Sequence, residues 1–289
     1  MSVRALLSLS FASLALAGAA ADAAAQGQGG RGASRQAPAA EDAEGLKDLD
    51  AETVGAFFPM RARIEAMKAR GFSATGLVPV YPDRVKCPEV DSPFAARTRG
   101  DGSMRAARFF QGFHGGIDIP VPEGTPVLAV AAGTVVFKTP GHSIGGIGIV
   151  LQHAPADTGL NVWTYTEYKH LKELPALDLG RRVAMGEAIA LSGKTGTQDG
   201  HYGPAGHAHL HLGAFFSDRP DYATRLILVP ADGRWMDPLA LFSGPPAGSG
   251  APAAPADAGG QVRIPYVTDD GAAVPAGTKT VWPLPCRAK

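Results

Sequence analysis

The sequence predicts a mainly β protein, with a small antiparallel β-sheet domain, an N-terminal helical segment and irregular flanks. Charged residues make up only 19% of the 289 residues, whereas 37 are glycine and 24 are proline, a balance typical of a loop-rich β protein. From residue 109 onward, short apolar runs alternate with turn residues, which is the pattern of an antiparallel sandwich or barrel.

The strands of this domain are predicted from short apolar runs bounded by turn signals. They are 117–121, 126–131, 133–138, 148–153, 162–170, 188–191, 210–216 and 226–229. Glycine-containing turns such as Glu123-Gly124 separate them. A short helical stretch at 238–242 closes the domain, which we place at 105–243.

The region at 41–104 is predicted to be helical and then irregular. Apolar residues between 41 and 71 recur mostly at three-, four- and seven-residue spacings, which indicates a helix that packs as an arm or serves as a spacer. Pro59 should kink or split this helix, and Gly71 should end it.

The flanks carry other patterns. Residues 1–25 are typical of a secretory signal peptide, with Arg4 before an apolar run and small residues at the cleavage site. A transmembrane anchor is the alternative, but the run is short for a span of about 20 residues. Segments 26–40 and 244–260 lack large apolar side chains and are predicted linkers, and 261–289 forms a C-terminal tail.

Charge and cysteine content limit the classes of partner and the cellular compartments that we expect for this chain. The formal net charge is +0, which gives no electrostatic argument for nucleic acid or for an anionic membrane surface. After signal cleavage we expect no stable membrane span, and a periplasmic or extracellular location. The two cysteines, Cys87 and Cys286, could form a disulfide in an exported chain, with two free buried thiols as the alternative.

Clustered histidines mark a candidate metal site. A catalytic zinc site needs neutral imidazoles, usually a carboxylate, and one position left open for water. If the HAHLH segment is a strand, His209 and His211 point to the same face, because strand side chains alternate. Between His114 and Asp118, two glycines disfavour a helix and predict a turn or bulge that brings both side chains to one point.

These motifs stand in a specific order. The segment FHGGIDIPVPEGTPVLAVAAGTVV is followed by EYKHL, GEAIALSGKTG, GHAHLH and finally MDPLALF. Together they resemble the M23 peptidases of the lysostaphin and LytM type, zinc endopeptidases that cut peptide stems or cross-links of peptidoglycan. The resemblance implies the small antiparallel β domain of that family (the duplicated hybrid motif-like type). It also implies a hydrolase with one Zn²⁺ per chain, acting on peptidoglycan peptides.

The resemblance also implies roles for individual residues. The three zinc ligands would be His114, Asp118 and His211. His209 would be the general base, and His170 would stabilise the oxyanion or protonate the leaving amine.

Other residues near these motifs leave their roles open. Tyr168 and His207 could line the substrate groove, although Tyr168 could also be packing and His207 a surface residue. We expect His142, His153 and His201 to face solvent or lie in loops.

Three alternatives to a peptidoglycan endopeptidase are open at this point. A non-catalytic LytM-like factor that binds peptidoglycan or activates an amidase typically lacks ligands, whereas here all five matched positions are occupied. A histidine phosphocarrier disagrees with the export signal and with Asp118. A general secreted protease would share the mechanism and differ in the shape of its groove.

Overall fold

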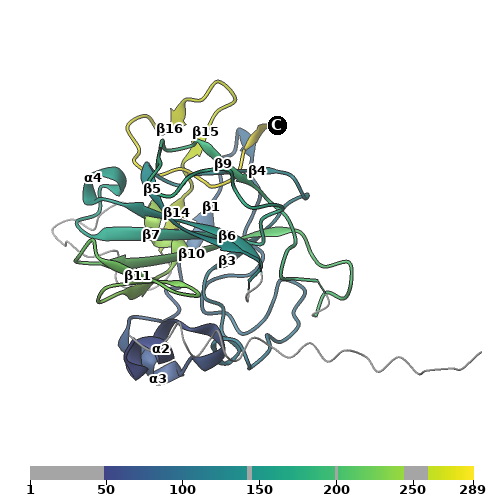
Figure 1. Ribbon diagram of the computed structural model, residues 1–289. Coiled ribbons are helices and arrows are strands. Elements are labelled where there is room, and N and C mark those ends of the chain that lie inside the picture. Colours follow the sequence, from purple (N-terminus) through teal and green to yellow (C-terminus); the bar gives the residue numbers. More distant parts are fainter. Residues whose placement is uncertain (1–48, 142–144, 199–200, 244–259) are drawn as a thin grey trace, which may run out of the picture. The chain divides into compact units, whose positions relative to one another are not determined.

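The computed structural model describes residues 49–141, 145–198, 201–243 and 260–289, which belong to one compact unit spanning residues 40–289. Among these residues, seven strands form a central antiparallel sheet in the order β13-β10-β7-β6-β5-β8, and β3 pairs with β10 beside β13 (Figure 1). The strands are β3 (Ile117–Pro120), β5 (Gly133–Pro140), β6 (Ile147–His153), β7 (Trp163–Lys169), β8 (Arg182–Val183), β10 (His209–Ser217) and β13 (Arg234–Met236).

Smaller two-stranded sheets surround the central one. Four antiparallel pairs lie within the described residues: β4 (Pro126–Leu128) with β9 (Ala188–Leu191), β11 (Tyr222–Thr224) with β12 (Leu228–Pro230), β15 (Tyr266–Val267) with β16 (Ala273–Val274), and β2 (Val85–Lys86) with β17 (Arg287–Ala288). A parallel pair joins β1 (Val78–Val80) to β14 (Gln261–Arg263). The mainly β, antiparallel class is confirmed, and this parallel pair departs from it.

The helices of the described residues are short. They are α2 (Ala51–Phe57), α3 (Ile64–Ala69) and α4 (Pro155–Thr158), with the 3₁₀ turns η1 (Pro59–Arg61), η2 (Phe110–Gly112) and η3 (Pro238–Phe242). As predicted, the helical segment is split at Pro59, which begins η1 between α2 and α3, and Gly71, at φ +84°, comes just after α3.

The N-terminal helices pack onto the sheet through aromatic side chains. The ring of Trp235 on β13 stacks against Phe57 at 5.6 Å and meets Phe72 edge-on at 5.2 Å. Its indole N–H donates to the Ala56 carbonyl oxygen at 3.1 Å. Of the two roles predicted for this segment, the structure therefore shows a packing arm.

Each of the eight predicted strands overlaps an observed one. The predicted bounds 188–191 are those observed for β9. The predicted bounds of β6, β7 and β10 differ from the observed ones by one residue at one or both ends. The strands that were missed before the tail, β1, β2, β8, β11 and β13, are two or three residues long, too short for a visible alternation. The C-terminal tail contributes four short strands where one or two were expected.

The tail is also joined covalently to the N-terminal region. Cys87 and Cys286 form a disulfide across 199 residues of sequence, next to the β2–β17 pair. Trp282, fully buried, donates its indole N–H to the Pro88 carbonyl oxygen at 3.0 Å. Strand pairing, disulfide and tryptophan thus fix both flanks to the domain.

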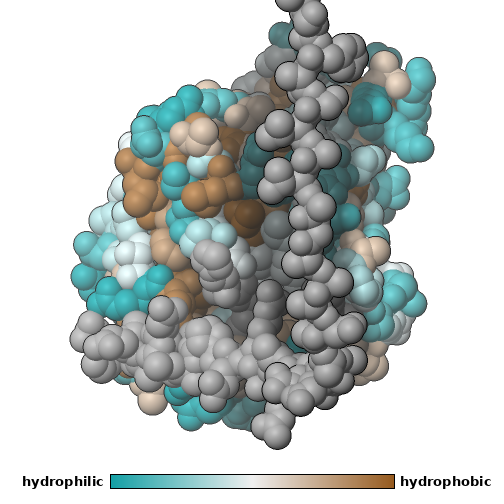
Figure 2. All heavy atoms as spheres, turned by 45° about the vertical axis from the view of Figure 1, so that its right-hand side comes forward, coloured by the Kyte–Doolittle hydropathy of each residue, from teal (hydrophilic) through white to brown (hydrophobic). Residues whose placement is uncertain are grey.

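Several sequence predictions concern residues outside this description. The predicted signal peptide at 1–25 and linker at 26–40 lie outside it, as do His142 and all but the last residue of the predicted linker at 244–260. Within the part of the chain that is described, no helix is both long and apolar enough to span a membrane. Figure 2 shows a face on which apolar residues gather in one area, bordered by hydrophilic ones.

His153 is not the solvent-facing or loop histidine that we expected. It ends β6 and is fully buried, because it continues the inward-facing series of Ile149 and Leu151. Its Nδ1–H donates to the Ala132 carbonyl oxygen at 2.7 Å, and its Nε2 lies 2.8 Å from the Thr166 hydroxyl. Both ring nitrogens therefore have partners that suit a neutral imidazole.

This buried histidine should make stability depend on pH. Burial lowers the pKa of His153 to about 4, whereas an unfolded histidine titrates near pH 6.5. The unfolded chain therefore binds the extra proton first as the pH falls, and the contribution is complete above about pH 6.5 and lost toward pH 4. We expect the difference to reach about 3 kcal/mol of unfolding free energy.

Urea unfolding of the wild type and of His153→Gln at several pH values measures this dependence. Between pH 7 and pH 4 the wild type should lose about 3 kcal/mol more than the variant, since the other buried histidines are common to both. If the unfolding free energies of the two proteins changed with pH in the same way, His153 would not be held neutral by the fold.

Candidate active site

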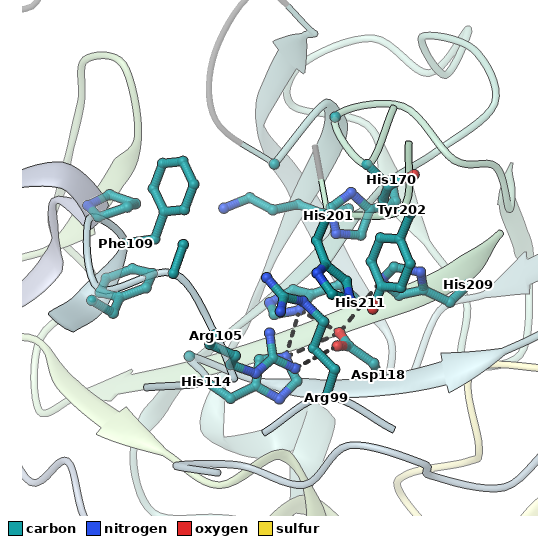
Figure 3. A pocket seen from close by; sticks show the side chains of 18 of the residues that line it. Arg99, Arg105, Phe109, His114, Asp118, His170, His201, Tyr202, His209 and His211 are labelled. Carbon is teal, nitrogen blue, oxygen red and sulfur yellow. Dashed lines mark hydrogen bonds and ion pairs between the residues drawn. The ribbon is translucent and has the colours of Figure 1, made fainter. Parts of the chain in front are cut away.

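A pocket of about 370 Å³ opens at the end of the central sheet where β3 and β10 begin to pair (Figure 3). The five residues whose motifs suggested chemistry all line it: His114, Asp118, His170, His209 and His211. They come from the loop before β3, from β3 itself, from the residue after β7, and from β10. The sheet thus brings together segments that are almost 100 residues apart.

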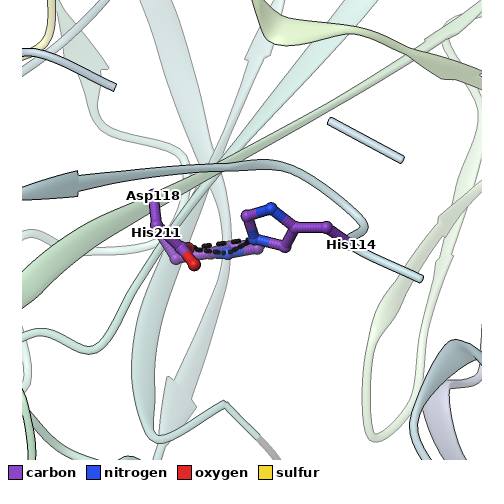
Figure 4. Close-up of side chains that lie close together, drawn as sticks. All are labelled: His114, Asp118 and His211. Carbon is purple, nitrogen blue, oxygen red and sulfur yellow. Dashed lines mark hydrogen bonds and ion pairs between the residues drawn. The ribbon is translucent and has the colours of Figure 1, made fainter. Parts of the chain in front are cut away.

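Three of these side chains converge on one point (Figure 4). In the β10–β3 register, His211 lies directly opposite Asp118, and its Nδ1 is 2.9 Å from Asp118 Oδ1. His114 Nε2 lies 3.0 Å from the same oxygen and 3.1 Å from His211 Nδ1. The three atoms form a nearly equilateral triangle.

The HGGID segment needs its second glycine for this convergence. The two glycines form a bend between His114 and β3, as the sequence predicted. A Cβ atom at Gly116 would lie 2.3 Å from the Leu212 carbonyl oxygen and 2.8 Å from His211 Nε2. Only glycine lets the chain pass this close to β10, because any side chain would displace His211.

Hydrogen bonds fix which atoms face the point of convergence. His114 Nδ1–H donates to the Pro93 carbonyl oxygen at 3.0 Å, which leaves the Nε2 lone pair directed at Asp118 and His211. The other carboxylate oxygen, Asp118 Oδ2, accepts from Arg105 Nη2 at 2.8 Å. The same guanidinium nitrogen donates to Ser92 Oγ at 2.6 Å. Asp118 Oδ1 is therefore the oxygen turned toward the histidines.

This donor set fits a divalent cation such as zinc. An imidazole lone pair and a carboxylate oxygen repel one another at 3.0 Å unless a proton or a cation lies between them. Ligands of a tetrahedral zinc ion, each about 2.0–2.1 Å from the metal, lie roughly 3.3 Å apart, close to the separations observed here. Two imidazoles with one carboxylate also form a familiar set of three protein ligands for catalytic zinc.

Burial controls the protonation of the cluster. It lowers the pKa of His114, His209 and His211, so that these imidazoles are neutral, as metal ligands and bases must be. Burial alone would raise the pKa of Asp118, but its interactions with His114 and His211 hold it well below its usual value. The cluster thus contains a carboxylate among neutral imidazoles.

Two further histidines, His209 and His170, face the same point, and their hydrogen bonds fix the tautomer of each ring. His209 Nδ1–H donates to the His207 carbonyl oxygen at 3.0 Å, and His170 Nδ1–H donates to the Thr195 carbonyl oxygen at 2.8 Å. The ring centroids of His209 and His170 are 4.5 Å apart, and His209 Nε2 lies 3.6 Å from Asp118 Oδ1. Both histidines therefore present an unprotonated Nε2.

The backbone at His170 is strained, and this conformation accompanies the position of its side chain in the pocket. His170 follows β7 with φ +60°, a left-handed conformation that is uncommon for residues other than glycine. Such strain persists only where the surrounding structure enforces it, and it concentrates at functional sites. Burial, reinforced by His209 and His211, lowers the pKa of His170 well below its ordinary value.

Comparison with known sequences agrees with this geometry. Residues 112–220, which include all five of these side chains, match the sequence model of Peptidase family M23. Over these residues the chain is similar to the M23 peptidases, and we refer to them as the M23 domain. The predicted resemblance is thereby confirmed, and the matched segment runs from the end of η2 past β10.

Curated relatives resemble about a third of this chain. Peptidoglycan DD-endopeptidase ShyA of Vibrio cholerae is 35% identical over 108 residues, which are 37% of this chain and 21% of the relative. A protein of Haemophilus influenzae described as an uncharacterized metalloprotease is 37% identical over 101 residues, 34% of this chain and 18% of the relative. The chain thus matches about a fifth of the length of these relatives.

Solved structures give a weaker likeness. The catalytic domain of lysostaphin from Staphylococcus simulans is 25% identical with a TM-score of 0.31, covering 44% of this chain and 77% of that one. A zinc-containing peptidase from Vibrio cholerae is also 25% identical, with a TM-score of 0.34, covering 49% of this chain and 36% of that one. These TM-scores are too low to support an argument from superposition.

Two residues considered for the substrate groove lie differently within the M23 domain. Tyr168 does not line the groove: it is fully buried, and its hydroxyl accepts the Val130 N–H at 2.9 Å. Burial raises the pKa of Tyr168 to about 12, so it stays protonated. His207 is partly exposed and stacks on Tyr202, which lines the pocket, with ring centroids 5.0 Å apart.

His201 is exposed and lies in a turn, as expected, and it also lines the pocket, where its Nε2 lies 2.9 Å from Ser103 Oγ. Sequence reasoning missed the arginines of the pocket. Arg99, Arg105 and Arg108 line the pocket as well. Their only signal in the sequence was a run of arginines just before the HGGID segment, without any regular spacing.

Proposed function

We propose that this chain is an exported zinc-dependent endopeptidase that hydrolyses peptide bonds in the stems or cross-links of peptidoglycan. The observation that carries the proposal is the convergence of two neutral imidazoles and one carboxylate, all within 3.1 Å of one another, beside two more unprotonated imidazoles. The endopeptidase name of the Vibrio cholerae relative supports the substrate class.

Three residues would hold the metal: His114 through Nε2, Asp118 through Oδ1 and His211 through Nδ1. Zinc bound there would supply Lewis acidity to the scissile carbonyl and make a water nucleophilic near neutral pH. Arg105 and the Pro93 carbonyl oxygen would keep the ligand atoms oriented, as outer hydrogen-bond partners of metal ligands usually do.

His209 is the general base in this proposal. Its Nε2 carries a lone pair, because Nδ1–H is engaged by the His207 carbonyl oxygen, and it lies 3.6 Å from Asp118 Oδ1. It would take the proton of the attacking water at Nε2. Burial favours its neutral form, which favours passing the proton on to the leaving amine.

His170 would act on the other side of the scissile bond. Its Nε2 also starts unprotonated, so it can donate a hydrogen bond only after it has accepted a proton, which the second proton of the attacking water would supply. In that state it would stabilise the developing oxyanion or protonate the leaving amine. The backbone strain at His170 is consistent with a side chain held for this purpose.

Export is part of the proposal. A buried disulfide between Cys87 and Cys286 suits the periplasm or the extracellular space, since cytosolic thiols are kept reduced. The signal-like residues 1–25 point to the same compartment. We propose that the chain acts after these residues are removed.

The test is digestion of purified peptidoglycan by the chain without residues 1–25, with new amino groups counted and released muropeptides identified by mass spectrometry. We expect about one zinc per chain, loss of activity on chelation, and recovery when zinc is added back. His211→Ala should bind little zinc and release nothing. A zinc-loaded wild type that releases no amino groups would favour the non-catalytic alternative, and efficient casein cleavage would favour a general protease.

A further inference from the structure

The pocket is strongly positive although the whole chain carries no net charge. Among the described residues that line it, the permanent cations are Arg99, Arg105, Arg108 and Lys169. The same described lining contains a single carboxylate, Asp118, which the zinc proposal already uses. A metal cation would add to this positive charge, so the site favours a ligand that brings negative charge of its own.

Two of the cations are already neutralised. Arg105 pairs with Asp118 at 2.8 Å, and Lys169 pairs with Glu167 at 2.9 Å. Within the described residues, neither Arg99 nor Arg108 forms a salt bridge. These two guanidinium groups are the pocket's available partners for an anion.

Arg99 is held in place before any ligand arrives. Its Nη1 donates to the Met104 carbonyl oxygen at 2.6 Å, and its guanidinium lies over the Tyr202 ring at 5.7 Å. These contacts use one nitrogen and one face, and leave the other N–H groups of the planar fork for a ligand. Arg99 lines the same pocket as Asp118 and the histidines (Figure 3).

Arg108 lies by the aromatic part of the pocket. It packs over the Phe109 ring at 4.7 Å and is exposed. Figure 3 shows Phe109 well apart from His209 and His170. Phe110 and Phe113 line the pocket too, so Arg108 adds positive charge beside an apolar wall.

We propose that Arg99 binds a free carboxylate of the peptide substrate close to the scissile bond, and that Arg108 strengthens the attraction along the pocket. This inference rests on the proposed endopeptidase function and narrows its substrate class. It points to stems or cross-links with an acidic residue next to the cleaved bond, and away from neutral glycine bridges. A guanidinium fork suits this role, because it can donate two parallel hydrogen bonds to one carboxylate.

The test uses two cross-linked peptides that differ only in one group, a carboxylate or a carboxamide on the residue beside the scissile bond. For the zinc-loaded wild type we expect kcat/KM to be about tenfold or more higher for the carboxylate peptide, mainly through a lower KM. In Arg99→Gln this ratio should fall toward one, and in Arg108→Gln it should fall less. Arg219→Gln, which removes an exposed arginine outside the pocket, should keep the wild-type ratio.

A wild type that cleaves both peptides equally well would overturn the inference and leave the proposed function standing. So would a ratio that survives Arg99→Gln. If neither peptide is cleaved, the proposed function fails, and calorimetric binding of the same two peptides decides the inference separately. Tighter binding of the carboxylate peptide by the wild type, lost in Arg99→Gln, supports it, and equal affinities reject it.

Discussion

Replacing His209 with alanine is expected to lower kcat for peptidoglycan hydrolysis by about 10²- to 10⁴-fold while zinc stays bound. The side chain contributes its Nε2 lone pair to the pocket but none of the three atoms that converge on one point. Its loss therefore removes proton transfer and leaves the proposed ligands in place. Metal analysis alongside steady-state kinetics on muropeptides measures both effects.

His207→Ala is the matched control for this prediction. It removes an imidazole two residues away, yet keeps the backbone carbonyl oxygen that accepts the His209 Nδ1–H. Its kcat should stay within a few-fold of the wild type. His211→Ala should differ from both, because it loses a proposed ligand and the metal with it. Equal activity of His209→Ala and wild type would assign the base to another group, with His170 the first candidate.

The part of the site that could be predicted lies where local pattern and strand geometry determine position. Because side chains alternate along a strand, His209 and His211 had to share a face, and in the structure both begin β10 and line the pocket. The glycine pair after His114 predicted a bend, because two consecutive glycines disfavour a helix. Bringing these residues to Asp118 required the β10–β3 register, which the family resemblance supplied and the local pattern did not.

Other positions depended on contacts that leave little trace in sequence. Arg105 lies in an irregular segment, and nothing in its spacing indicates that its guanidinium bonds to Asp118. His153 is different, since Ile149, Leu151 and His153 alternate and all three are buried. The alternation could have predicted its burial, whereas we expected a solvent-facing or loop histidine because His153 matches no motif of the family.

Removing the disulfide is expected to destabilise the protein by roughly 2–5 kcal/mol while leaving kcat nearly unchanged at temperatures well below the unfolding midpoint. The bond closes a loop with a sequence separation of 199 residues, for which the chain-entropy relation gives roughly 5 kcal/mol at 25 °C as an upper value. Urea unfolding of the Cys87→Ser/Cys286→Ser double variant measures the loss without leaving a reactive free thiol.

Activity should survive because the tail is attached away from the catalytic side chains. Two of its backbone bonds run from Val281 N–H to the Val130 carbonyl oxygen at 2.7 Å and from Leu128 N–H to the Pro283 carbonyl oxygen at 2.8 Å. Both partners belong to the β4 region, whereas the proposed ligands depend on β3 and β10. Fraying of the tail would therefore lower the free energy of unfolding before it displaced His211. If kcat of the double variant fell in parallel with stability at low temperature, the tail would have to support the pocket as well as the fold.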